Sequence, residues 1–167
     1  RRVGAKTADA LDARDQAYNI QLEFDLLRPA DYKKVKKAIQ SGKLRWIHFA
    51  PPCATFSRGR EGDGIPAIRS VEKPEGLWPR GQRGRKVEEA NTLAIRTALL
   101  AKMAFRAGVF MSVENPEWSY IWELPVYKEL LDLEGVQDVC GDQCCFGAMA
   151  AKPTRWRTNA PWMEVLN

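Results

Sequence analysis

The chain has one histidine, four cysteines and no long apolar run, and each of these features argues against a class of protein or of site. Four cysteines in 167 residues are too few for a disulfide-stapled scaffold. They suit a reducing compartment, so we expect an intracellular protein, nuclear or cytoplasmic. No apolar stretch is long enough to span a bilayer, and residues 1–4 do not open a signal peptide, so we expect no membrane partner.

The scarcity of histidine and the spacing of the cysteines argue against two kinds of site. A cysteine hydrolase needs a base beside its nucleophile, but His48 lies five residues before Cys53 in the same expected strand, on the opposite face. Cys140, Cys144 and Cys145 do not have the paired spacing of zinc ligands. We therefore set the hydrolase aside and expect no metal.

Length and charge favour one soluble domain with a mild preference for polyanions. The 167 residues are 45% apolar and 28% charged, which predicts a single globular domain over 1–167. A net charge of +5 favours nucleic acid as a partner without establishing it. The opening Arg1-Arg2-Val3-Gly4 reads as the interior of a longer protein, so we expect a monomer or part of a larger chain.

Strand-like and helix-like stretches alternate along the chain. This rhythm predicts an α/β fold with a mostly parallel sheet covered by helices on both faces. Between them, residues 58–86 form a long basic segment rich in glycine, which predicts a functional loop. The expected strands are 5–11, 21–24, 44–49, 109–113, 136–140 and 155–158, and the expected helices are 31–39, 87–105 and a short one from Pro125.

Two unusual motifs follow two of the expected buried strands. Pro51-Pro52-Cys53 comes after one strand and Glu114-Asn115-Pro116 after the next. Ligands of parallel sheets bind at the carboxyl ends of the strands, so both motifs are expected at one binding edge. The two prolines hold Cys53 rigidly, as a nucleophile requires. A buried structural cysteine and a capping or salt-bridging glutamate are the alternatives.

These motifs resemble those of a known family. Pro51-Pro52-Cys53-x-x-Phe56-Ser57 resembles the nucleophile motif of cytosine C5 methyltransferases, and Val113-Glu114-Asn115-Pro116 resembles their Glu-Asn motif, in the same order. The resemblance implies a Rossmann-like, S-adenosylmethionine-dependent methyltransferase fold. The family's glycine-rich first motif and its target-recognition region are not visible, so we expect a fold that is incomplete at its N-terminus.

The resemblance also implies the catalytic roles. Cys53 would add to C6 of cytosine as a thiolate, and Glu114 would hold N3. Further on, Arg155-x-Arg157 resembles the family's arginine pair, although Pro153 stands where the family has glutamine. We expect the two arginines on opposite faces of their strand, one at the base O2 and the other at the backbone or a phosphate. Two exposed charges at a strand edge are the alternative.

The donor and nucleic-acid contacts are implied in the same way. Asp12, with Asp9 as its competitor, would bind the donor's ribose, and Asp25 its adenine; Pro51 would lie beside the donor. The 58–86 segment corresponds to the family's mobile loop, which closes over a flipped base, in DNA rather than RNA. A solvated loop, or a non-catalytic nucleic-acid-binding domain, remains the alternative. The residues expected at nucleic acid are Ser57, Arg58, Arg60, Arg83 and Arg85.

Overall fold

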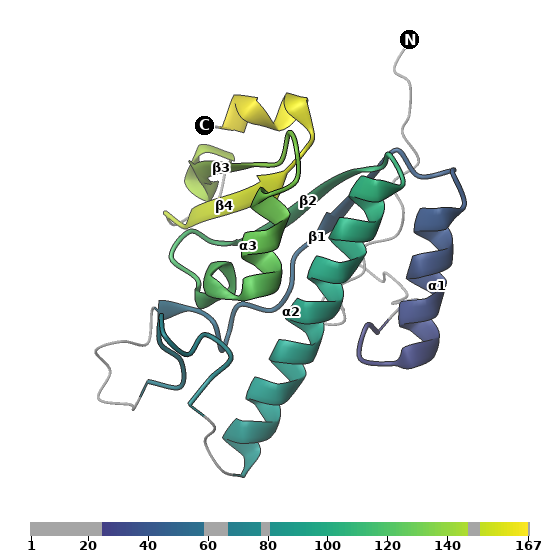
Figure 1. Ribbon diagram of the computed structural model, residues 1–167. Helices are drawn as coiled ribbons and strands as arrows, with labels where there is room; N and C mark the ends of the chain where they lie inside the picture. The colour runs from purple at the N-terminus through teal and green to yellow at the C-terminus, as the bar shows by residue number, and fades with distance from the viewer. Residues whose placement is uncertain (1–24, 59–66, 78–80, 147–150, 167) are drawn as a thin grey trace.

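The computed structural model describes residues 25–58, 67–77, 81–146 and 151–166 (Figure 1). The strands expected at 5–11 and 21–24 lie outside these residues. Three α-helices, four strands and three short 3-10 helices are described, and they confirm the predicted α/β class. Their bounds are α1 Pro29–Gln40, β1 Trp46–Phe49, α2 Gln82–Arg106, β2 Phe110–Pro116, η3 Tyr120–Glu123, α3 Pro125–Leu131, β3 Gln137–Asp142, η4 Gln143–Phe146, β4 Pro153–Thr158 and η5 Pro161–Leu166.

The four strands form one mixed sheet in the order β1-β2-β4-β3. Only β1 and β2 are parallel, with Phe49 opposite Val113, and α2 makes the crossover between them. Strand β4 runs antiparallel to both β2 and β3. The expectation of a mostly parallel sheet is therefore wrong for the described strands. The segment between β3 and β4 is too short for the crossover that a parallel pair requires.

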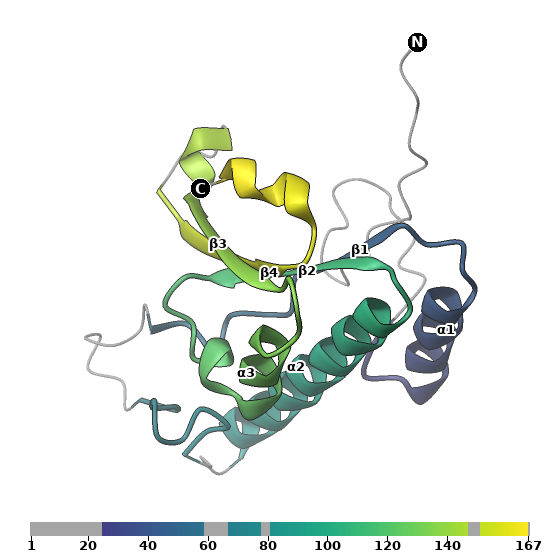
Figure 2. The same cartoon turned by 45° about the horizontal axis from the view of Figure 1, so that its top comes forward.

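The helices divide unequally between the faces of the sheet. Figure 2 shows α1, α2 and α3 together on one face, with η5 over the other. On that second face the Trp162 ring of η5 meets Phe110 edge-on, with centroids 4.7 Å apart. The expectation of helices on both faces holds only for this short 3-10 helix, because no α-helix of the described chain lies there.

Helix α2 contributes a long buried face to the hydrophobic core. Small residues let it approach the sheet closely, and its buried stripe has the predicted helical spacing. It ends at Arg106 before Gly108, whose φ of 69° favours glycine. None of the described helices has the length and apolarity needed to cross a membrane. The buried stripe comprises Val87, Ala90, Ala94, Ala98, Ala101 and Ala104.

The helix begins earlier than the sequence pattern predicts. Because α2 starts at Gln82, Arg83 and Arg85 belong to its first two turns rather than to a loop. The described part of the expected 58–86 loop is therefore residues 58, 67–77 and 81, and the remainder up to residue 86 is helical or outside the described residues.

Candidate functional site

Cys53 lies in a tight turn just beyond β1. Its carbonyl oxygen accepts hydrogen bonds from the backbone N–H groups of Phe56 (2.9 Å) and Ser57 (2.8 Å). Phe56 is fully buried beneath the turn, whereas Cys53 is half-buried. The buried Phe56 ring and the two backbone hydrogen bonds fix the turn, so Cys53 is held in a defined position near the surface.

Two hydrogen bonds join this turn to the end of β2 and to the start of η3. Asn115 Nδ2 donates to the Pro51 carbonyl at 2.8 Å, and the Tyr120 N–H donates to the Phe56 carbonyl at 2.9 Å. Asn115 is fully buried, so its bond is shielded from water. The carboxyl ends of β1 and β2 therefore meet, and they bring the Cys53 turn beside the Glu114-Asn115-Pro116 segment.

Glu114 lies on β2 opposite Trp156 of β4, with 15% of its side chain exposed. Lys152 Nζ and Gln143 Nε2 approach its Oε1 at 3.4 and 3.5 Å. Gln143 and Lys152 are joined by a backbone hydrogen bond of 3.3 Å at the end of the β3–β4 ladder. Sequence reasoning missed both residues, because only the register of that antiparallel ladder brings them to Glu114.

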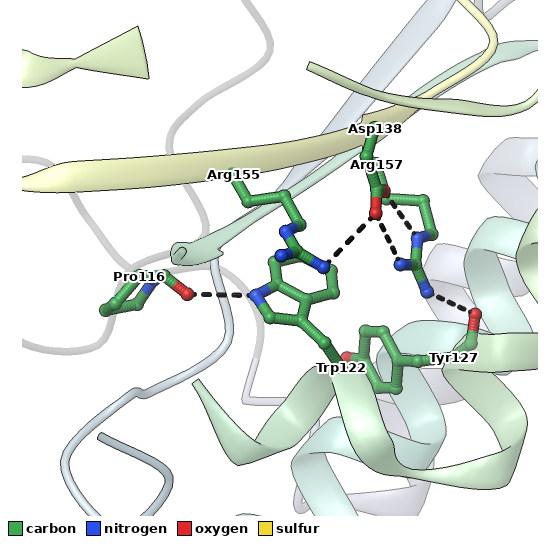
Figure 3. A network of polar contacts seen from close by, with 6 residues as sticks. All are labelled: Pro116, Trp122, Tyr127, Asp138, Arg155 and Arg157. Carbon is green, nitrogen blue, oxygen red and sulfur yellow. Dashed lines mark hydrogen bonds and ion pairs between the residues drawn. The ribbon is translucent and has the colours of Figure 1, made fainter. Parts of the chain in front are cut away.

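The arginine pair of β4 lies elsewhere (Figure 3). Arg157 is 2% exposed; its Nε and Nη2 each bond Asp138 at 2.7 Å, and its Nη1 bonds the Tyr127 carbonyl at 2.5 Å. Arg155 also reaches Asp138, at 3.3 Å. Both guanidinium groups lie over the Trp122 ring, 5.5 Å (Arg155) and 5.0 Å (Arg157) from its centroid. The polar hydrogens of Arg157 are thus committed to the protein interior.

The two arginines share one face of the sheet, so the expectation of opposite faces is wrong. Side chains two residues apart on a strand point the same way. Arg155 stands opposite Asn115, and Trp156 stands opposite Glu114. Since directly opposed residues share a face, the arginines lie on the α3 side and Glu114 on the other. The structure does not bring Arg155 or Arg157 to Glu114.

The residues expected at nucleic acid gather partly at the same edge. Ser57 and Arg58 follow the Cys53 turn, and the Arg58 guanidinium lies 4.6 Å from the centroid of the Tyr120 ring. Arg83 and Arg85 are exposed on the first turns of α2. Because α2 returns antiparallel to the strands, its start lies at their carboxyl edge (Figure 1). Arg60 lies outside the described residues.

The donor-side candidates are only partly described. Asp12 and Asp9 lie outside the described residues. Asp25 precedes α1; its Oδ1 accepts the Leu27 N–H at 2.9 Å, and its Oδ2 lies 3.6 Å from Arg28 Nε. With 42% of its side chain exposed, Asp25 keeps acceptor capacity on Oδ2 and fits a hydrogen bond from an adenine amino group. Pro51 is buried, with its carbonyl bound to Asn115.

Metal ligation has no support in the described ranges, where no group of three or more His, Cys, Asp or Glu side chains could hold an ion. A scan against protein-family models, a search of the curated proteins and a search of the solved structures each found no match. The function of the chain is therefore inferred from its own residues and the contacts between them.

Proposed function

We propose that the chain is the base-modifying part of a cytosine C5 methyltransferase with Cys53 as its nucleophile. The observation that supports this proposal is the junction of two strand ends. Asn115 Nδ2 bonds the Pro51 carbonyl at 2.8 Å and joins the Cys53 turn to the strand that carries Glu114. A nucleophile and a carboxyl group held by adjacent strand ends can act on the same small ring.

The chemistry assigns a separate task to each residue. Cytosine C5 is too weak a nucleophile to accept a methyl group, and addition of the Cys53 thiolate at C6 raises the electron density at C5. Glu114 stabilises the resulting adduct through N3. Lys152 and Gln143 both approach Oε1 of Glu114, which leaves Oε2 to meet the base. Once C5 has taken the methyl group, its proton passes to a solvent base and the C6–S bond breaks, so the thiolate leaves and the aromatic ring is restored.

Substrate and donor follow from the same chemistry. A cytosine in a duplex must leave the base stack before a thiolate can reach C6, so the substrate is a flipped or single-stranded nucleotide. We propose DNA over RNA as the polymer, and the test below includes both. S-adenosylmethionine supplies a methyl group on a sulfonium, which needs no further activation. Asp25 would hold the adenine of this donor, and Asp12 its ribose.

The test is covalent trapping, in the presence of S-adenosylmethionine, on oligonucleotides, DNA and RNA, that carry 5-fluorocytosine. Fluorine at C5 cannot leave as a proton does, so the Cys53–C6 bond persists and the protein migrates with the oligonucleotide under denaturing conditions. We expect Cys53→Ser to abolish this adduct. Cys144→Ser, at an exposed cysteine outside the turn, is the matched control and should preserve it.

A second readout does not depend on the donor. Reversible addition of Cys53 to C6 lets C5 exchange its hydrogen with solvent, so tritium should leave 5-tritiated cytosine even without S-adenosylmethionine. Absence of both adduct and exchange, with oligonucleotide binding intact, would reject the methyltransferase proposal. That outcome would favour the non-catalytic nucleic-acid-binding domain.

A further inference from the structure

Arg69 is the most deeply buried cation of the described chain, with 1% of its surface exposed. Its Nε donates to the Thr55 carbonyl and its Nη2 to Thr55 Oγ1, both at 2.9 Å. Its Nη1 donates to the Pro74 carbonyl at 2.5 Å and to Asn91 Oδ1 at 2.8 Å. The guanidinium also lies 3.6 Å from the centroid of the Phe56 ring. The Arg69 side chain therefore links the Cys53 turn, the 67–77 segment and α2.

The 67–77 segment is folded against α2. Asn91 Nδ2 donates to the Glu75 carbonyl at 2.7 Å, and the Leu77 N–H donates to the Ile68 carbonyl at 2.9 Å. Gly76 has a φ of 115°, and a Cβ there would lie 2.7 Å from Val87 Cγ1 of α2. Residues 67–77 are thus packed against α2 in this structure.

Burial of the charged Arg69 side chain carries a desolvation penalty, and its hydrogen bonds show which groups it holds in place. Removal from water lowers the pKa of Arg69 to about 10, while the charge of Glu75 raises it, so the group stays charged at neutral pH. Its four hydrogen bonds go to neutral oxygens. An apolar side chain could fill this space without the desolvation penalty. Only a planar fork of donors can hold both oxygens of Thr55 at once.

We propose that Arg69 is a positioning residue for Cys53. The Cys53 carbonyl is fixed by the N–H groups of Phe56 and Ser57, and Arg69 fixes the opposite side of the same turn at Thr55. Arg69 thereby sets the path of the thiolate relative to Glu114, and it does not contact the nucleic acid. This inference rests on the proposed function, since it names what orients that nucleophile.

The test compares Arg69→Met and Arg69→Lys with Arg106→Met, a matched change at an exposed arginine at the far end of α2. Amide hydrogen exchange should show a loss of protection of about tenfold or more at the Phe56 and Ser57 N–H groups in Arg69→Met, because the turn opens locally. Amides of β2 and β4 should keep their protection. Arg106→Met should leave the turn unchanged.

The kinetic readout separates positioning from binding. At saturating 5-fluorocytosine oligonucleotide, Arg69→Met should form the adduct about 10- to 100-fold more slowly, since small misplacements of a nucleophile cost this much. Its Kd for the oligonucleotide should change by less than about twofold, because no phosphate contact is lost. Arg69→Lys should restore part of the rate, since lysine keeps the charge but not the fork.

Three results would overturn the inference. A raised Kd with an unchanged rate at saturation would make Arg69 a nucleic-acid contact. Loss of protection across the whole sheet would make it a general packing residue, and an unchanged turn with an unchanged rate would remove its role. If the wild-type protein forms no adduct, the proposed function fails by itself, and the amide exchange still decides whether Arg69 holds the turn.

Discussion

At the scale of single residues, Arg155 and Arg157 lie two positions apart on β4 but have different environments. Arg157 places three nitrogens on Asp138 and the Tyr127 carbonyl, and its side chain is 2% exposed. Arg155 makes a single 3.3 Å contact with Asp138, and its side chain is 25% exposed. Trp122 lies against both and donates to the Pro116 carbonyl at 2.9 Å. Arg157 thus supports the end of β2 from beneath, through Trp122.

We expect Arg157→Met to destabilise the fold by about 2–4 kcal/mol, because it removes the buried guanidinium that holds the part-buried Asp138 carboxylate through two hydrogen bonds. Arg155→Met removes one longer, more exposed contact and should cost about 1 kcal/mol or less. Free energies of unfolding from urea titrations measure both variants. Equal losses of unfolding free energy in the two variants would contradict the structural role of Arg157. A stable Arg157→Met protein that no longer binds cytosine would show that Arg157 contacts the base, as the resemblance implies.

The sequence alone predicts some residues of the site and not others. Cys53 and Glu114 can be placed because each lies near the carboxyl end of a short apolar strand, and parallel strands end at a common edge. Lys152 and Gln143 meet Glu114 only through the register of β3 and β4, which no local pattern specifies. Arg69 reads as one more basic residue of a polar segment, since its burial depends on contacts with residues 14 and 22 positions away.

At the scale of elements, helices follow from periodicity and strand directions do not. The apolar spacing of α1 and α2 predicts both helices, whereas a period of two is the same for parallel and antiparallel strands. The direction of β4 follows from the length of its connection to β3, because a parallel partner would require a crossover of a dozen or more residues. In the structure the connection is residues 143–152, whereas the strand bounds expected from the sequence leave residues 141–154, which is long enough for a crossover. The antiparallel direction of β4 could therefore not be predicted from the sequence pattern.

Helix α1 offers an element-scale test through Asp31 in its first turn. Hydrogen bonds from the Asp25 N–H and from Lys34 Nζ, both 3.1 Å, hold the pKa of Asp31 below its ordinary value of 3.8, against the opposing effect of burial. A lowered pKa means that the ionised carboxylate stabilises the folded state. That stabilisation is present above the ordinary pKa and is lost as pH falls through the lowered one.

We therefore expect Asp31→Asn to lower the Tm at neutral pH and to lose this disadvantage as pH falls below about 3.8. Thermal unfolding of both proteins across this pH range, followed by circular dichroism, gives the difference directly. Glu88→Gln, on the exposed face of α2, removes the same charge from the other large helix and serves as the control. Identical pH profiles for the two variants would contradict the role given to Asp31.

At the scale of the whole molecule, α2 separates two basic ends. Its 25 residues span about 37 Å, from the carboxyl edge of the parallel strands to the opposite edge. Arg83 and Arg85 are exposed at the first end, the one nearer the Cys53 turn, and Arg45 and Arg106 are exposed at the second. The net charge of +5 does not distinguish these ends, but the proposed function requires phosphates only at the first.

Salt dependence tests this asymmetry. Each phosphate contact releases counterions, so the double change Arg83→Gln and Arg85→Gln should weaken oligonucleotide binding and flatten the plot of log K against log salt by up to about two units. Arg45→Gln with Arg106→Gln removes the same charge from the far end and should leave the slope nearly unchanged. Fluorescence anisotropy over a salt series measures both. An equal decrease in slope for both double variants would mean that net charge alone attracts the nucleic acid. The Cys53 edge would then not be the binding surface.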